Sequence, residues 1–237
     1  IREKEKNSIA PEVNGDTMLG WDDYQKAGVG LIFGTLFSAP IRAKEGEWDI
    51  LTYRDQKEAR QQYLMQLDAY QKLLDEHSDR FRSITSMADL RMLLEERKRM
   101  EENPSDALPS LPIGLVYLME GADAITAPEK LSEWVERGVT LIGPAWHGTA
   151  YCGGTREPGG LTSAGYKLLE IMQNLNCVLD ISHMDEKAVF QAFDQFSGRI
   201  MASHSNALAL LRSRESNRFL SDEVIQHQHE TVMELIR

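Results

Sequence analysis

The chain has 237 residues, of which 42% are hydrophobic and 27% are charged, and its formal net charge is −11 at pH 7. This composition is typical of globular proteins, and the length suffices for one large domain with a substantial core. The acidic balance argues against nucleic acid and an anionic membrane surface as partners, and no apolar run approaches the ~20 residues that cross a bilayer. The two cysteines, Cys152 and Cys177, are too few for a disulfide framework and leave the compartment open, with a cytoplasmic location slightly favoured.

The first half of the chain predicts strands and two long helices. Residues 27–37 are apolar and punctuated by glycine, as expected of a buried strand. Apolar residues at helical spacing predict a helix over 55–77. A short strand is expected around "FRSIT", and Ser86 with Asp89 forms a capping box for the helix "MADLRMLLEERKRMEEN". Three prolines predict a loop over 103–112.

From residue 113 onward, predicted strands and helices alternate. The strands cover 113–121, 139–146, 177–182 and 199–203, and the helices cover 126–138, 162–176 and 185–196. Thr126 and Glu129 form a capping box, Gly138 ends the first of these helices, and the glycine-rich stretch 147–160 is read as a loop. This alternation predicts βα units around a parallel sheet. The fold class expected is therefore α/β, a (β/α)₈ barrel that is incomplete in this chain and forms one domain over residues 1–237.

Three chemically capable side chains stand where buried strands end. Glu120 ends one predicted strand, and His183 and His204 follow two others, each directly after a serine. Because the carboxyl ends of barrel strands open onto one face, these residues are expected to converge. One carboxylate and two imidazoles suit zinc, which takes such ligands at about 2.0–2.2 Å. The sequence therefore predicts a metal site formed by Glu120, His183 and His204.

Several other residues have two readings. Asp180 either orients a ligand histidine or pairs with a neighbouring strand, and both readings stay open. The glycines within 153–160 suit a flexible loop better than a phosphate cradle. A zinc thiolate at Cys152 is disfavoured, and His227 and His229 are read as part of a solvated helix face.

The motifs "MEGAD", "LTSAG", "LDISHM", "ASHSNALAL" and "NRFLSDE", in this order, resemble the metallopeptidase family of renal (membrane) dipeptidase. The resemblance is closest to the bacterial branch and covers roughly residues 14–226. It implies a (β/α)₈ TIM-type barrel of the metal-dependent hydrolase kind that carries two zinc ions. Family members cleave small dipeptides, often with a D-residue on the C-terminal side, and many are homodimers.

The resemblance also implies roles for individual residues. Glu120 corresponds to the carboxylate that bridges the two metals and holds a metal-bound hydroxide, and His183 and His204 correspond to the two histidines on one metal. Arg218 corresponds to the arginine that binds the substrate carboxylate. The family's substrate-binding histidine aligns with Trp146, and His147 lies one position later.

The chain departs from the family pattern in two places. It contains no His-x-Asp on a first strand, and no late aspartate follows residue 226, so segments are expected to be missing near the N-terminus and near 226–227. Without them the chain is expected to hold one well-bound metal or none. An alternative function is therefore a non-catalytic barrel that binds metal or a small amide. A phosphate-binding isomerase or synthase barrel is a third reading, which rests on the glycine-rich stretch.

Overall fold

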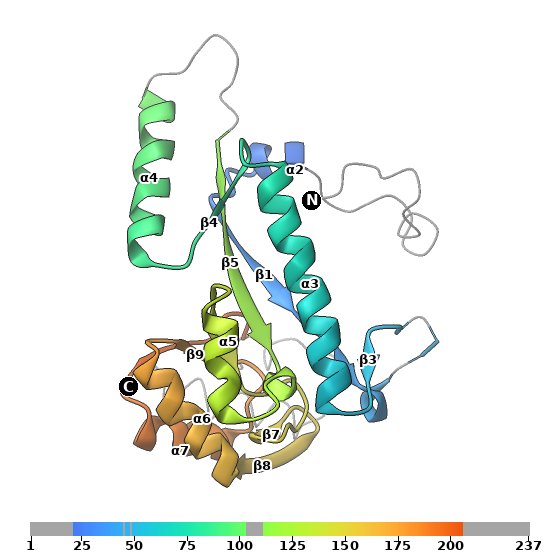
Figure 1. Ribbon diagram of the computed structural model, residues 1–237. Helices are drawn as coiled ribbons and strands as arrows, with labels where there is room; N and C mark the ends of the chain where they lie inside the picture. The colour runs from blue at the N-terminus through green and yellow to red at the C-terminus, as the bar shows by residue number, and fades with distance from the viewer. Residues whose placement is uncertain (1–20, 45, 48, 103–110, 206–237) are drawn as a thin grey trace, which may run out of the picture. The chain divides into compact units, whose positions relative to one another are not determined.

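The computed structural model describes residues 21–44, 46–47, 49–102 and 111–205, which form a mixed α/β structure (Figure 1). The chain divides into two compact units: unit 1 comprises Ile1–Phe33 and Gln71–Val116, and unit 2 comprises Gly34–Tyr70 and Tyr117–Arg237. The main sheet has the strand order β1-β5-β6-β9-β10, with β4 also paired to β5. The α/β class with a parallel sheet is thus confirmed, whereas a single barrel domain over residues 1–237 stays a prediction.

Unit 1 is built around a short parallel strand pair. Its complete elements are α2 (Trp21–Lys26), β4 (Phe81–Ser83) and α4 (Met87–Glu102). β4 pairs in parallel with Ile113–Leu115, the start of β5 (Ile113–Glu120). The predicted capping box of α4 is confirmed, because the Ser86 amide donates to Asp89 at 2.8 Å and the Asp89 amide donates to the Ser86 hydroxyl at 3.2 Å. Arg97 of α4 is buried and donates to the backbone oxygens of Val29 and Pro112.

Unit 2 contains the part of the sheet in which β5 continues beside β6. The strands of the main sheet that lie in unit 2 are the ends of β1 (Leu31–Leu36) and β5, together with β6 (Val139–Gly143), β9 (Val178–Asp180) and β10 (Arg199–Met201). Neighbouring strands in the series β5-β6-β9-β10 are all parallel. Most residues at their centres are buried, as expected where a parallel sheet is covered by helices.

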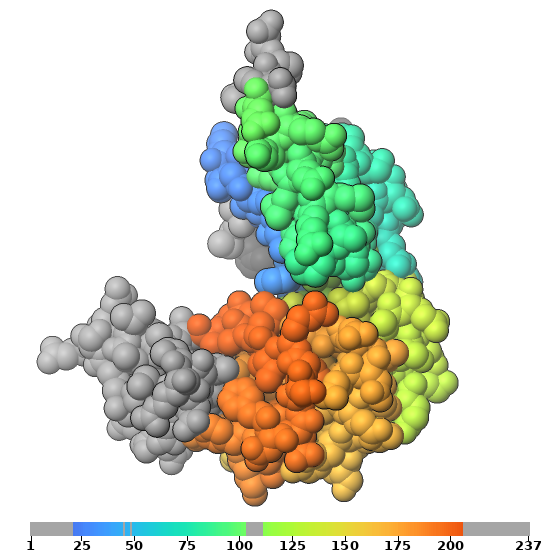
Figure 2. Space-filling model, turned by 90° about the vertical axis from the view of Figure 1, so that its left-hand side faces the viewer, coloured from blue at the N-terminus to red at the C-terminus, as the bar shows by residue number. Residues whose placement is uncertain are grey.

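Three helices lie side by side in unit 2, with α6 in the middle (Figure 1). They are α5 (Leu131–Val135), α6 (Ser163–Asn174) and α7 (Glu186–Gln195), and Figure 2 shows the α6–β10 segments in shades of orange. α6 begins as predicted, with the Thr162 side chain accepting from the Gly165 amide. The predicted helix 126–138 is instead a 3₁₀ turn, Pro128–Lys130, followed by α5. The capping box expected at Thr126 and Glu129 is wrong. The N-cap residue of this turn is Ala127, and no side chain makes a capping hydrogen bond there.

The loop predicted over 147–160 is confirmed for residues 147–151 and wrong for the rest, which forms a β-hairpin. β7 (Cys152–Gly154) pairs antiparallel with β8 (Glu157–Leu161). Glycine is required at Gly153, because a Cβ there would lie 2.2 Å from the backbone nitrogen of Gly159. The glycines therefore allow two backbones to approach closely.

Further elements of unit 2 lie between β1 and β4 in the sequence. They are β2 (Ala39–Pro40), the 3₁₀ turn Ile41–Ala43, β3 (Thr52–Tyr53), and α3 (Gln56–Glu76), which continues into unit 1. α3 buries Ala59, Tyr63 and Leu67. Among the described residues, no helix is both long enough and apolar enough to span a membrane.

Candidate functional site

The parallel register brings the two Ser-His sequences opposite each other. Met201 at the end of β10 is paired with Asp180 at the end of β9, and a histidine follows each of these residues by three positions. Glu120 is the last residue of β5 and is paired with Gly143 at the end of β6. All three predicted ligands therefore stand at the carboxyl edge of the sheet.

The functional atoms of these three residues converge on one point. Glu120 Oε1 lies 3.0 Å from His183 Nε2 and 3.3 Å from His204 Nε2, and the two imidazole nitrogens are 2.8 Å apart. Two atoms that each lie about 2.0–2.2 Å from one ion are at most roughly 4.4 Å apart, so all three separations suit a shared cation. The side chains are between 17% and 42% exposed, which leaves the point accessible to a ligand.

His183 is held by a tight turn and by the hairpin. Its φ of +67° lies in the left-handed region, which is uncommon for a residue other than glycine and recurs at functional sites. Immediately after it, Met184 forms a bridge to Gly154 of β7, and the Asp185 amide donates to the Gly153 oxygen at 3.0 Å. The hairpin also supplies Thr155, whose hydroxyl lies 3.0 Å from His183 Nδ1. The glycine-rich stretch thus positions a predicted ligand.

Glu120 is held through its backbone. The hydroxyl of Tyr63 in α3 donates to the Glu120 carbonyl oxygen at 2.7 Å, and the Gly121 amide donates to the Gly143 oxygen. Gly121 has φ of +85°, where a side chain would be strained, so the chain can turn sharply after β5. Burial raises the pKa of Tyr63, which keeps its hydroxyl protonated as a donor.

Trp146 and His147 have different environments. The Trp146 ring packs edge-on against Phe37 and lies 6.4 Å, centroid to centroid, from the His183 ring, so it borders the site. His147 is buried against Trp146, and its Nδ1 makes no hydrogen bond and lies 3.9 Å from Glu157 Oε1. Burial lowers the pKa of His147 despite the nearby carboxylate, so the ring is neutral at pH 7.

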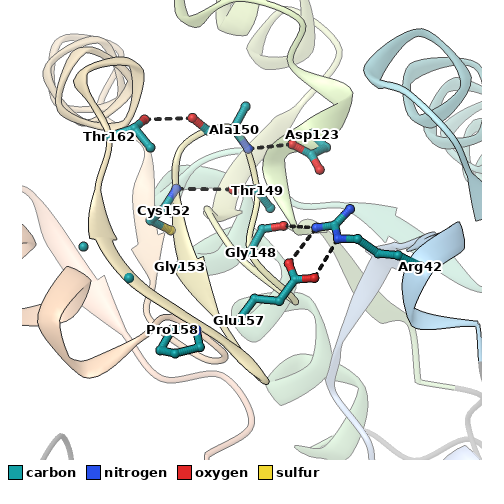
Figure 3. A pocket seen from close by; sticks show the side chains of 12 residues that line it. Arg42, Asp123, Gly148, Thr149, Ala150, Cys152, Gly153, Glu157, Pro158 and Thr162 are labelled. Carbon is teal, nitrogen blue, oxygen red and sulfur yellow. Dashed lines mark hydrogen bonds and ion pairs between the residues drawn. The ribbon is translucent and has the colours of Figure 1, made fainter.

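A pocket of about 420 Å³ lies beside the hairpin (Figure 3). Arg42 makes two hydrogen bonds to Glu157, at 2.6 and 2.7 Å, and a third to the Gly148 oxygen. Asp123 accepts from the Tyr53 hydroxyl at 2.6 Å and from the Ala150 amide at 2.9 Å. Because two carboxylates and only one guanidinium line this pocket, its charge does not favour phosphate, contrary to the third reading of the sequence.

The other predicted residues can be placed as follows. Cys152 is a buried thiol, and burial raises its pKa to about 12, so it is not a thiolate at neutral pH. Arg218, His227 and His229 lie outside the described residues. Sequence reasoning missed Thr155 and Ser203 as partners of the histidines, although the repeated Ser-His pair marks Ser203.

A family model described as membrane dipeptidase (peptidase family M19) matches residues 16–232. A curated relative, an uncharacterised protein in the PQQ-III 3' region of Acinetobacter calcoaceticus, is 32% identical over 165 residues, which cover 65% of this chain and 48% of the relative.

Solved structures share the fold. The probable dipeptidase PvdM of Pseudomonas aeruginosa is 21% identical with a TM-score of 0.67, covering 91% of this chain and 52% of that one. A metallo peptidase of Rhodobacter sphaeroides, solved with a phosphinate mimic of L-Ala-D-Ala, is 21% identical with a TM-score of 0.63, covering 86% of this chain and 62% of that one. The chain spans about half the length of the curated relatives it matches.

Proposed function

The chain belongs to the membrane dipeptidase family, and on this basis we propose that it carries part of the catalytic site of a zinc-dependent dipeptidase. The substrates proposed are small dipeptides, including those with a C-terminal D-residue. The observation that carries the proposal is the convergence of Glu120 Oε1, His183 Nε2 and His204 Nε2 from three strand ends. A carboxylate and two imidazoles are ligands that zinc accepts, and their separations suit one ion.

Bound zinc supplies a Lewis acid that lowers the pKa of water and polarises a substrate carbonyl. The chain's own residues would hold and shape the site. Glu120 would provide a negative charge that balances the cation, and Trp146 would form an apolar wall beside His183. We further propose that Arg218 binds the C-terminal carboxylate of the dipeptide through two parallel hydrogen bonds.

The choice of dipeptide follows from one of the solved relatives. The Rhodobacter sphaeroides protein was solved with a mimic of L-Ala-D-Ala, so Ala-D-Ala is the first substrate to test. His147 is proposed to hold Trp146 in place beside the substrate, because its buried ring packs against the indole.

The test is hydrolysis of Ala-D-Ala by the complete protein, before and after removal of metal with a chelator. We expect the activity to disappear on chelation and to return with zinc. His204→Ala should lower kcat/KM by more than about 100-fold, which exceeds the usual effect of losing an outer-shell partner. His77→Ala is the matched control, because His77 follows α3 in unit 1 and should leave the activity unchanged.

Two results would contradict the proposal. Hydrolysis that persists in metal-free protein would remove the role of zinc. Zinc binding at Glu120, His183 and His204 without turnover of any dipeptide would favour the non-catalytic barrel instead.

A further inference from the structure

The buried carboxylate of Asp180 connects the two Ser-His turns. Asp180 ends β9 and is 1% exposed. Its Oδ1 accepts from the backbone amides of Ser182 and Ser203, both at 3.1 Å, and its Oδ2 lies 2.5 Å from the Ser203 hydroxyl oxygen. An ionised carboxylate only accepts hydrogen bonds, so the Ser203 hydroxyl must donate its single proton to Asp180.

This donation fixes the proton of the neighbouring imidazole. Ser203 Oγ also lies 2.6 Å from His204 Nδ1, and having given its proton to Asp180 it can only accept there. His204 Nδ1 therefore carries a hydrogen, and in the neutral ring Nε2 has a free lone pair. That Nε2 is the atom that faces Glu120 and His183.

The remaining hydrogen bonds agree with this assignment. Ser182 Oγ accepts from the His204 backbone amide at 3.2 Å, which leaves its own proton free to point at Ser203 Oγ, 3.4 Å away. Every donor in the network then meets an acceptor, and both turns are tied to the same carboxylate.

His183 has a different partner. Its Nδ1 lies 3.0 Å from the Thr155 hydroxyl, and within the part of the chain that the structure describes no carboxylate hydrogen-bonds to that hydroxyl. The Thr155 proton can turn either way, so it accommodates both neutral forms of His183. Of these two histidines, only His204 has its proton position fixed by the hydrogen bond at its Nδ1.

We propose that Asp180 and Ser203 are positioning residues. They hold His204 with its proton on Nδ1 and its Nε2 lone pair directed at the candidate metal site, where Glu120 and His183 converge with it. This inference deepens the proposed function and rests on it for the identity of the ligand. Outer-shell carboxylates that orient ligand histidines typically contribute 10–100-fold to metal affinity.

Asp180→Asn tests the proposal sharply. Asparagine keeps one oxygen to accept from both backbone amides and places an amide donor beside Ser203 Oγ. The Ser203 hydroxyl should then donate to His204 Nδ1 at 2.6 Å, which is a closer acceptor than Ser182 Oγ at 3.4 Å, and the imidazole hydrogen should move to Nε2. In metal-free protein at about pH 8, where a typical histidine is neutral, nitrogen NMR shifts of His204 should change from the Nδ1–H to the Nε2–H pattern. Zinc affinity, measured by competition with a chromophoric chelator, should fall about 10–100-fold.

Three further variants separate positioning from general stability. Ser203→Ala should weaken zinc binding, and Ser203→Thr, which keeps the hydroxyl, should restore it. Thr155→Val is the matched control on the other histidine and should leave the His204 proton on Nδ1. An Nε2–H signal for His204 in the wild-type protein, or an unchanged signal in Asp180→Asn, would overturn the proposal. Because the NMR signal is read without metal, this result stands apart from the dipeptidase test, which fails separately if the wild-type protein binds no zinc.

Discussion

At the scale of single residues, the meaning of the Ser-His repeat lies in both of its members. The two histidines present Nε2 to Glu120, while Ser203 and the amides after each strand connect to Asp180. The sequence predicted the histidines from their position at strand ends. It left Asp180 open between orienting a ligand and pairing strands. The hydrogen bonds of Asp180 reach the turns after both β9 and β10, which supports the orienting role proposed above. Which hydroxyl donates to which partner depends on contacts between residues that are more than twenty positions apart, so it could not be predicted from local pattern.

His147 makes the stability of the fold depend on pH. Because burial lowers its pKa below the ordinary value of about 6.5, the unfolded chain binds a proton more readily than the folded one. Stability should therefore fall as the pH drops through about 6.5, by at most about 1.4 kcal/mol per pH unit for this group. His147→Gln should reduce that slope in urea unfolding measured between about pH 5 and 7.5.

Glu157→Gln provides the opposite perturbation. The Glu157 carboxylate raises the pKa of His147 and so opposes the effect of burial. Its removal should lower the folded pKa further and make the loss of stability on acidification larger. Equal slopes in the wild-type protein and both variants would show that His147 does not titrate as its surroundings indicate.

At the scale of elements, most patterns within one segment were predicted correctly, except for the helix and capping box expected over 126–138. Patterns that depend on a distant segment were not predicted. The strand expected over 113–121 is β5, Ile113–Glu120, because eight mostly apolar residues specify a buried strand locally. The hairpin β7–β8 was missed, since its strands are short and rich in glycine. Its contacts are distant in sequence, because Arg42 donates a hydrogen bond to Glu157 and the Asp185 amide donates one to the Gly153 oxygen.

The close approach within the hairpin predicts a difference between two glycines. Gly153→Ala would place a Cβ 2.2 Å from the Gly159 nitrogen and should destabilise the protein by about 1–3 kcal/mol. Gly159→Ala is the matched control, since its nearest contact would be an ordinary 3.7 Å. That variant should be neutral or stabilising by about 0.4–1 kcal/mol in thermal or urea unfolding.

The clash in Gly153→Ala should also weaken the candidate metal site. Gly153 accepts from the Asp185 amide just after the His183 turn, and Thr155 follows on the same hairpin. Zinc affinity should therefore fall in Gly153→Ala and not in Gly159→Ala. Equal effects of the two substitutions on stability would mean that the hairpin does not need its close backbone contact.

At the scale of the whole molecule, the candidate metal point joins segments that are far apart in the chain. Glu120 ends β5, and His183 and His204 follow β9 and β10, so a bound ion would link three strand ends. An ion that binds the folded state and not the unfolded chain stabilises it by mass action, by about 2.7 kcal/mol at a hundredfold excess over its Kd. For a chain of this size that corresponds to a rise in Tm of roughly 5–10 °C.

Differential scanning calorimetry of metal-free protein, with and without added zinc, measures this rise. His204→Ala should abolish it because one of three ligands is lost, while His77→Ala should keep it in full. If zinc raised the Tm of His204→Ala as much as that of the wild-type protein, the ion would be binding elsewhere. The convergence of the three strand ends would then be a feature of the fold alone, because two imidazoles and a carboxylate can hold one another by hydrogen bonds without a cation.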